Sequence, residues 1–317
     1  MVSIIRVGLP CFHLGETDKS SDVRLFKSVG SLFLFGKEFV YMFFSDEDNM
    51  FTSQAAIFLA AMSYQTYPLY FEGKLTLPKG FQLRYTIQAF ADVENPTEHV
   101  YGFVAESKDE IIIAFRGYAA YPADLLAAYD ILQVPYPFVT DAGKTSRGFT
   151  CLYQSTRDQF IRKINQFPAS KKLFITGHNY GGALAVLAAL DIAVNTKFRQ
   201  PIVYTYGSPR IGDPHFASRF NQVVANSLRI VNVHDSFPTF PDQKYPPPFT
   251  QKGIYYQHVK NKFPLSFQLN NTPRNDSIAC YFHSLTQLDP DYAQTLCVEN
   301  PGFCPNTDTC IPFLGKC

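Results

Sequence analysis

The chain has 317 residues, of which 46% are hydrophobic and 15% aromatic, so it can bury a large core and is not a disordered protein. Lys and Arg number 28 against 27 Asp and Glu, and a net charge of +1 is too small to attract nucleic acid. No apolar run reaches the roughly 18 residues that a membrane span needs, because Lys37 and Glu38 interrupt the most apolar one. We therefore exclude a nucleic-acid partner and a transmembrane segment.

Residues 1–46 are predicted to form an N-terminal extension. The run SLFLFGKEFVYMFF within it fits either a pair of strands or a displaced signal sequence. Arg6 and Pro10 break the apolar patch that precedes it, so no secretory signal is visible there. Two explanations are open: the native start lies elsewhere, or the extension derives from a signal sequence.

Residues 47–290 are predicted to form one α/β domain. A helix begins in the acidic, capping-rich start of SDEDNMFTSQAAIFLAAMSYQTY, and the segment 99–117 is a strand hairpin with a polar turn. Strands and helices then alternate, with helices at 149–167, after Gly181 and from about Asp213, and strands at 171–177, 201–207 and 227–235. Such alternation indicates parallel strands covered by helices on both faces.

The segment GHNYGG, residues 177–182, has the layout of a nucleophile elbow between a strand and a helix. Gly177, Gly181 and Gly182 are the glycines that so tight a turn requires. Asn179 stands at the apex, where a hydrolase of this kind carries its nucleophile. The lone pair of an amide nitrogen is delocalised into the carbonyl group, so residue 179 is not expected to attack an ester near neutral pH.

The triad partners of such an elbow follow in the order acid, then histidine. Asp235 lies just past the strand SLRIVNV, and His283 follows in CYFHSLTQL. The alternative is that neither residue is catalytic: Asp235 then forms a turn after the strand, and His283 caps a helix or is buried in the core. His258 is the rival histidine, but its aromatic, strand-like surroundings favour a packing role.

Five segments in this order resemble the class 3 lipases, the fungal-type triacylglycerol lipase family: IIIAFRG, RGFTCLYQS, FITGHNYGGALAVLAA, YGSPRIGD and RIVNVHDSFPTFP. The resemblance implies an α/β-hydrolase fold over residues 47–290, with a mostly parallel central sheet and helices on both faces. It also implies an oxyanion hole at Tyr118 and Tyr180, a triad aspartate at Asp235, and a lipid or a lipid–water interface as partner. Neither a cofactor nor a metal is implied.

The chain departs from the family at the residues that carry the chemistry. Asn179 replaces the serine nucleophile, Tyr180 replaces the leucine after it, and Tyr118 replaces a small hydroxyl residue. We therefore expect a lipase-like protein that has lost or nearly lost ester hydrolysis and that binds lipid or a protein partner. The alternatives are an active lipase with Tyr180 or deamidated Asn179 as nucleophile, and an ordinary lipase in which the asparagine is a sequence variant or gene-model error.

Asparagine is nevertheless an intelligible occupant of the elbow. Among non-glycine residues it tolerates a positive φ unusually well. Its amide is expected to hydrogen-bond to His283, which would keep the old triad as a polar cluster. Nearby, Tyr121, Tyr136 and Phe138 lie where lipases of this family carry a lid, so they are candidates for an acyl-chain groove, with core packing as the alternative.

Residues 291–317 form a cysteine-rich tail, for which two local disulfides among Cys297, Cys304, Cys310 and Cys317 are expected. Cys151 and Cys280 are either joined by a long-range disulfide or buried free thiols. Asn270 and Asn275 begin N-glycosylation tripeptides. Together these features predict a secreted, extracellular protein.

Overall fold

The computed structural model describes residues 31–35, 38–42, 51–90, 98–119, 127–245 and 253–310. The chain divides into two compact units, Met1–Met50 and Phe51–Cys317. In the first unit, strands β1 (Ser31–Phe35) and β2 (Glu38–Met42) form an antiparallel pair. Within the described ranges, no helix is both long enough and apolar enough to cross a membrane.

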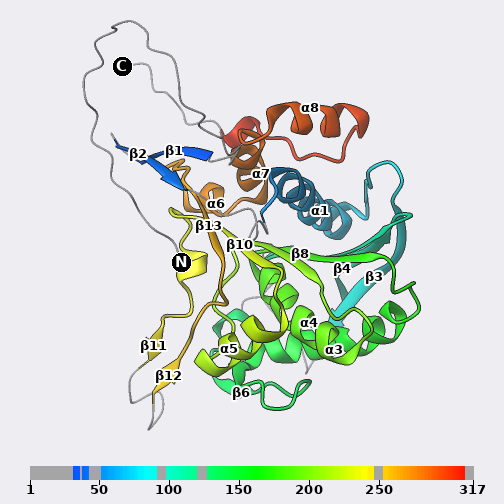
Figure 1. The fold of residues 1–317 in the computed structure, drawn as a ribbon, viewed down its shortest axis with the longest axis vertical. Helices are drawn as coiled ribbons and strands as arrows, with labels where there is room; N and C mark the ends of the chain where they lie inside the picture. The colour runs from blue at the N-terminus through cyan, green and yellow to red at the C-terminus, as the bar shows by residue number, and fades with distance from the viewer. Residues whose placement is uncertain are drawn as a thin grey trace, which may run out of the picture. The chain divides into compact units, whose positions relative to one another are not determined.

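The second unit is built on a seven-stranded sheet in the order β13-β10-β9-β8-β5-β4-β3 (Figure 1). The five strands from β13 to β5 run parallel, and β4 and β3 continue the sheet as antiparallel strands at one edge. The strands are β3 (Gln82–Phe90), β4 (Glu98–Glu106), β5 (Glu110–Phe115), β8 (Lys172–His178), β9 (Ile202–Tyr206), β10 (Ser227–Asn232) and β13 (Lys262–Leu265). The predicted hairpin at 99–117 corresponds to β4 and β5.

Helices cover both faces of this sheet (Figure 1). Helices α3 and α4 pack on one face with α5 against α4, and α1 packs on the other face with α7 and α8 beside it. The helices are α1 (Ser53–Glu72), α3 (Arg147–Ile164), α4 (Tyr180–Asn195), α5 (Pro214–Val223), α6 (Thr272–Asn275), α7 (Ile278–Thr286) and α8 (Pro290–Glu299), with 3-10 turns η1 (Phe237–Thr239) and η2 (Asp308–Cys310).

Two short antiparallel pairs stand outside the main sheet. Strand β6 (Gln133–Pro135) pairs with β7 (Lys144–Ser146), and β11 (Lys244–Tyr245) pairs with β12 (Ile254–Tyr255). The β6–β7 pair lies in the connection that leaves the carboxyl end of β5, and the β11–β12 pair lies in the connection that leaves the carboxyl end of β10. Ligands bind at that end of the sheet in α/β folds.

Local sequence explains where the first helix begins and ends. The Thr52 hydroxyl accepts a hydrogen bond from the Ala55 amide at 3.2 Å, and Gly73 ends the helix in the left-handed conformation at φ 65°. The helix therefore begins later than the acidic stretch of residues 46–48 predicted, and that stretch lies outside the described residues.

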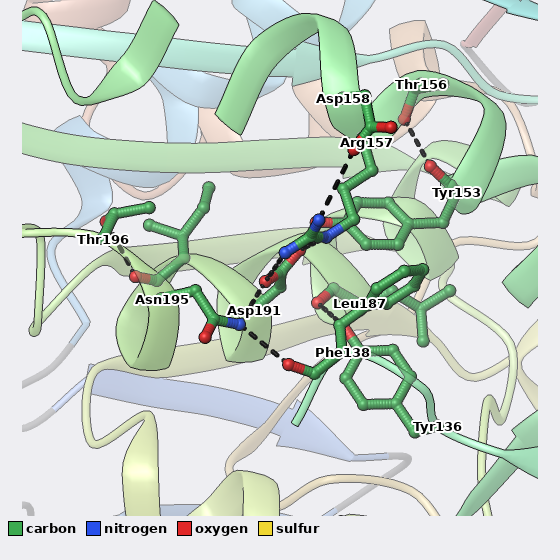
Figure 2. A network of polar contacts seen from close by, with 11 residues as sticks. Tyr136, Phe138, Tyr153, Thr156, Arg157, Asp158, Leu187, Asp191, Asn195 and Thr196 are labelled. Atoms are coloured by element: carbon green, nitrogen blue, oxygen red, sulfur yellow. Dashed lines mark hydrogen bonds and ion pairs between the residues drawn. The ribbon is translucent and has the colours of Figure 1, made fainter. Parts of the chain in front are cut away.

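A buried polar network ties α3 to α4 (Figure 2). Asp191 of α4 is fully buried and accepts hydrogen bonds from Tyr153 Oη at 2.7 Å, Arg157 Nε at 2.6 Å and Asn195 Nδ2 at 2.6 Å. Arg157 also lies 4.7 Å over the Phe138 ring. Removing one partner of such a buried ion pair costs about 3 kcal/mol or more, so this network fixes how the two helices pack.

The same network holds two of the predicted lid residues inside the fold (Figure 2). Tyr136 is 4% exposed, and its hydroxyl donates to the Leu187 carbonyl at 2.7 Å. The Phe138 carbonyl accepts from Asn195 Nδ2 at 2.8 Å, and its ring packs on the core. Tyr136 and Phe138 are therefore packing residues, which corrects their assignment to an acyl groove. Tyr121 lies outside the described residues.

The disulfides differ in part from the expected local pairing. Cys297 pairs with Cys304 inside the tail, as expected, but Cys310 pairs with Cys280 and so ties the tail to α7. Cys151 is exposed and free, and Cys280 is bonded to Cys310, so both alternatives for this pair, a shared disulfide and buried free thiols, are wrong. The fourth tail cysteine, Cys317, lies outside the described residues.

The two glycosylation tripeptides have different surroundings. Asn275 is 4% exposed; its Nδ2 donates to Gln268 Oε1 at 2.8 Å and its Oδ1 accepts from the Leu269 amide at 2.9 Å. An amide engaged in this way cannot carry a glycan in the folded protein, so this prediction is wrong. Asn270 is exposed and remains a predicted acceptor.

Candidate active site

The candidate site is the turn between β8 and α4. Asn179 at its apex has φ 55° and ψ −117°, a conformation that non-glycine residues adopt only where the surrounding structure imposes it. The backbone amide of Asn179 donates a hydrogen bond to the Tyr206 carbonyl at 2.9 Å, which holds the turn against β9. Asn179 is 3% exposed, so the apex is a buried position.

The predicted elbow glycines are required by close contacts. A Cβ on Gly177 would lie 2.2 Å from backbone atoms of Gly181, and a Cβ on Gly181 would lie 2.1 Å from the Phe115 carbonyl oxygen. A Cβ on Gly182 would lie 2.6 Å from Ser208 Cβ. The turn therefore packs tightly against β5 and against the loop that follows β9.

Both ends of the Asn179 carboxamide make hydrogen bonds. Its Oδ1 accepts from the Tyr180 amide at 2.8 Å, and its Nδ2 donates to Asp276 Oδ2 at 2.7 Å. In an α/β-hydrolase the amide after the nucleophile is a donor of the oxyanion hole. Here that donor is already occupied by the side chain of its own neighbour.

Asp276 is the site residue that the sequence analysis missed. It follows the short helix α6, and its Oδ1 lies 3.3 Å from His178 Nε2, within ion-pair distance although the angle is unsuitable for a hydrogen bond. His178 Nδ1 lies 2.7 Å from Tyr67 Oη. In the sequence, Asp276 is only the middle of a glycosylation tripeptide, and its distance from Asn179 along the chain gave no signal of contact.

Asp235 lies beside this cluster, as its position after β10 predicted. Its Oδ2 accepts from Tyr281 Oη at 2.8 Å, and its Oδ1 accepts from the Phe237 amide at 2.9 Å. A Cβ on Gly207, where φ is 59°, would lie 2.8 Å from Asp235 Oδ2 and 3.4 Å from Asp276 Oδ1. The two carboxylates thus converge where only a glycine fits.

This environment alters the protonation of Asp235. Burial, and to a smaller extent the negative charge of Asp276, raise its pKa to about 7. The Phe237 amide, the Tyr281 hydroxyl and His178 act in the opposite direction. Asp235 therefore keeps its proton over much of the pH range in which the aspartate of a catalytic triad is ionised.

His283 does not join the cluster, which corrects its assignment as the triad histidine. It lies on α7 two residues after Tyr281, so the two side chains point about 200° apart around the helix. Because Tyr281 faces Asp235, His283 faces away, and its imidazole makes no hydrogen bond within the described residues, whereas its backbone carbonyl accepts from Thr286 and Gln287. The expected bond between Asn179 and His283 is therefore absent.

The rival histidine, His258, does not approach the elbow either. Its Nε2–H donates to the Pro238 carbonyl at 2.7 Å, and burial, with the charge of Arg229, lowers its pKa to about 3. It is therefore a neutral, packed side chain. Neither histidine that the sequence singled out meets Asn179.

Tyr118 and Tyr180, the predicted oxyanion-hole residues, lie together at the elbow with ring centroids 5.4 Å apart. The Tyr180 side chain is 4% exposed, and its ring also contacts Phe149 at 5.3 Å and Phe237 at 5.2 Å. This packing disfavours the Tyr180 hydroxyl as a substitute nucleophile. Among the described residues, no three His, Cys, Asp or Glu side chains gather to hold a metal ion.

A mostly parallel sheet, an elbow with positive φ at its apex and an aspartate beyond a later strand define an α/β-hydrolase. Solved structures confirm this fold. The Rhizomucor miehei lipase in complex with its propeptide is 25% identical, with a TM-score of 0.53, and the match covers 68% of this chain and 70% of that one. A lipase from Rhizopus microsporus var. chinensis is 21% identical, with a TM-score of 0.53, and covers 67% of this chain and 74% of its own.

Sequence relatives identify the family. Residues 112–245 match the family described as Lipase (class 3). Lipase ZK262.3 of Caenorhabditis elegans is 30% identical over 241 residues, which is 71% of this chain and 67% of that protein. The chain therefore belongs to the class 3 lipase family, as the five sequence segments indicated.

Other curated relatives match over smaller shares of their length. Phospholipase A1 EG1 of Oryza sativa subsp. indica is 28% identical over 243 residues, 59% of this chain and 54% of that protein. The lipase of Rhizomucor miehei is 34% identical over 146 residues, 43% of this chain and 39% of that protein. The chain thus spans about half, or less, of these two relatives.

Proposed function

We propose that this class 3 lipase family member does not hydrolyse esters at its elbow and acts instead by binding a lipid surface. The absence of hydrolysis is inferred from the hydrogen bonds of the Asn179 carboxamide, which accepts from the Tyr180 amide and donates to Asp276. A serine attacks because it passes its proton to a histidine as it bonds to carbon. Here residue 179 carries no hydroxyl, and no histidine bonds to its side chain within the described residues.

The parent protein is expected to remain unlabelled by a fluorophosphonate probe. It is also expected to hydrolyse p-nitrophenyl esters of short and long acyl chains at the rate of a protein-free blank, because no activated hydroxyl stands at residue 179. Intact mass spectrometry detects the label, and an active fungal class 3 lipase serves as positive control. Stoichiometric labelling would overturn the proposal. A mass gain of about one dalton in the Asn179 peptide would reveal deamidation to a carboxylate nucleophile.

An aromatic pathway from the elbow to the surface supports the second half of the proposal. Ring centroids are 5.2 Å apart between Tyr180 and Phe237, 6.3 Å between Phe237 and Phe240, and 6.0 Å between Phe240 and Tyr129. Tyr129 is 71% exposed, and the neighbouring Leu132 is 42% exposed. Large apolar groups exposed beside a lipase-like site are suited to a lipid surface, which would cover them.

Replacing Tyr129 and Leu132 by serine is expected to reduce the fraction of protein bound to phosphatidylcholine vesicles about tenfold, because each side chain contributes about 1 kcal/mol or more of apolar burial. Co-sedimentation with vesicles measures this. Phe71→Ser is a matched control, since Phe71 is a large apolar side chain that is 62% exposed near the C-terminal end of α1 and takes no part in the aromatic pathway. Equal loss in the control, or no vesicle binding by the parent, would contradict the role of this surface.

We also propose a secretory route for the chain. Two disulfides support it, since such bonds persist in oxidising compartments, and relatives include the secreted mono- and diacylglycerol lipase MDL3 of Malassezia globosa. Asn270 is the exposed glycan acceptor in this proposal. A glycosidase-sensitive mass on the Asn270 peptide, from protein expressed in a eukaryotic host, is the measurement that tests it.

A further inference from the structure

A cavity of about 510 Å³ lies away from the elbow, where the loop after β9, strand β10 and the β11–β12 pair meet. Its lining combines cations with aromatic and amide side chains. The cations are Arg210, Arg229 and Lys244, and the aromatic groups are Tyr255 and Tyr256. No Asp or Glu lines it among the described residues.

Arg229 is the unusual member of this lining. It stands inside β10, a strand buried along its whole length, and is only 7% exposed. Its Nε donates to the Val259 carbonyl at 2.9 Å, which is the only hydrogen bond of its side chain within the described residues. No ion pair with a carboxylate is formed there, so the outer nitrogens of the guanidinium are left for the cavity.

A buried arginine without a carboxylate is costly. Burial, and to a smaller extent the nearby charge of Arg210, lower the pKa of Arg229 to about 10. Burial also lowers the pKa of Arg210, although Asp242 and Tyr245 partly oppose this. Two cations that repel each other next to an open cavity are stabilised when an anion binds between them.

The other groups around Arg229 do not neutralise it. His258, which also faces the cavity, is held neutral, and Lys262 adds positive charge to its surroundings. Arg210 Nη1 donates to the carbonyls of Thr239 and Pro241, the latter at 2.7 Å, so Arg210 is held in place by dipoles rather than by a carboxylate. The local field in the cavity is therefore positive.

We propose that this cavity binds an oxyanion of the phosphate class. The planar guanidinium of Arg229 offers paired donors that match two phosphate oxygens, and Lys244 at the exposed rim supplies a second charge. The Tyr255 ring, 45% exposed and 5.8 Å from Lys244 Nζ, is placed to cover an apolar part of the same ligand. The anion is either free phosphate or the phosphate of a lipid headgroup.

Inorganic phosphate titrated into the full chain and followed by calorimetry tests the site. Arg229→Gln is expected to weaken binding at least tenfold, and Lys244→Gln about threefold. Lys244→Gln alters an exposed rim residue, so it keeps the proposal testable if Arg229→Gln fails to fold. Arg84→Gln is the control, because Arg84 pairs with Glu106 at 3.3 Å and lines a different cavity.

Vesicles distinguish the two sources of the anion. Extra retention by phosphatidylcholine vesicles that contain phosphatidic acid, relative to phosphatidylcholine alone, would indicate a headgroup if it is lost in Lys244→Gln but not in Arg84→Gln. Binding of inorganic phosphate without such retention would indicate a free phosphate. The proposal is overturned if neither probe binds, or if Arg229→Gln and Lys244→Gln bind both probes as the parent does. Tyr129→Ser is expected to leave phosphate binding unchanged, which separates this site from the proposed lipid surface.

Discussion

The double variant Asn179→Ser/Asp276→His is expected to react with a fluorophosphonate and to gain esterase activity, whereas either single variant stays silent. The reason is geometric. In the parent, Asn179 Nδ2 and Asp276 Oδ2 meet at 2.7 Å, and each of these atoms is two bonds from its Cβ. In the double variant, serine Oγ is one bond from its Cβ and histidine Nε2 is three bonds from its Cβ, so the total number of bonds is the same. The exchange of Ser and His for Asn and Asp therefore conserves the distance that the two side chains span.

The single variants lack one half of the chemistry. Asn179→Ser supplies a hydroxyl, but its neighbour Asp276 is a carboxylate, a weaker base than an imidazole near neutral pH. Asp276→His supplies the imidazole without a nucleophile. With both changes, Asp235 lies beside the new histidine, as the acid of a triad does. The expected gain in esterase rate over the parent is about a hundredfold, a small part of what a complete triad contributes.

Two further variants make the test specific. Adding Asp235→Asn to the double variant is expected to abolish the gained labelling, because it removes the acid that orients the imidazole. Circular dichroism and thermal unfolding show whether each variant is folded. If Asn179→Ser alone labels fully and loses its label in the combination with His283→Ala, then His283 is the base and the role of Asp276 is disproved.

The sequence predicted the elbow because its constraints are local. Gly177 and Gly181 are needed by contacts within a few residues of the turn and with a neighbouring strand, and the alternation of strands and helices fixes where the turn stands. Asp235 was predictable for a related reason. It follows a parallel strand directly, and the carboxyl ends of such strands meet at one edge.

The partner of Asn179 was not predictable in this way. The segment from α6 to α7 offers a histidine at 283 and an aspartate at 276, and chemistry alone favours the histidine. Which of them reaches the elbow depends on the helix phase: Tyr281 faces Asp235, so a residue two positions later faces away. The rotation of α7 about its axis is determined by tertiary packing, and a sequence motif contains no information about it.

Contacts across the fold account for the other corrections. The sequence places Cys280 far from Cys310, and only the packing of the tail on α7 brings them within 5.1 Å between Cα atoms. Asn275 has the sequence of a glycan acceptor, but its side-chain amide hydrogen-bonds to Gln268 and Leu269 in the loop before α6. Tyr136 has the position of a lid residue, but its hydroxyl bonds to α4. In each case the missing information was a partner distant in sequence.

The paired carboxylates of the site are expected to make folding stability fall as pH rises from about 4 to 7. Asp235 has a pKa of about 7 in the folded protein against 3.8 for an ordinary aspartate. Between these values the folded state holds a proton that the unfolded state has released, so the free energy of unfolding decreases with pH. This contribution is complete below pH 4 and is lost as pH passes 7. The slope is that of a single released proton, on the order of 1 kcal/mol per pH unit.

Urea unfolding of the parent and of Asp235→Asn, measured at several pH values from 4 to 8, isolates this contribution because other titrating groups cancel in the difference. The groups that face Asp235 are Asp276, His178 and Tyr281, and all are retained in the variant. Asp109→Asn, on the exposed turn between β4 and β5, is expected to follow the parent. If the stability difference between the parent and Asp235→Asn is flat from pH 4 to 7, the two carboxylates do not share a buried site. A steep fall would mean that the protein tolerates, at neutral pH, an ionised buried Asp235 beside the charge of Asp276, an arrangement that destabilises the fold. Such a cost is consistent with the proposed function, in which the site keeps its shape without hydrolysing esters.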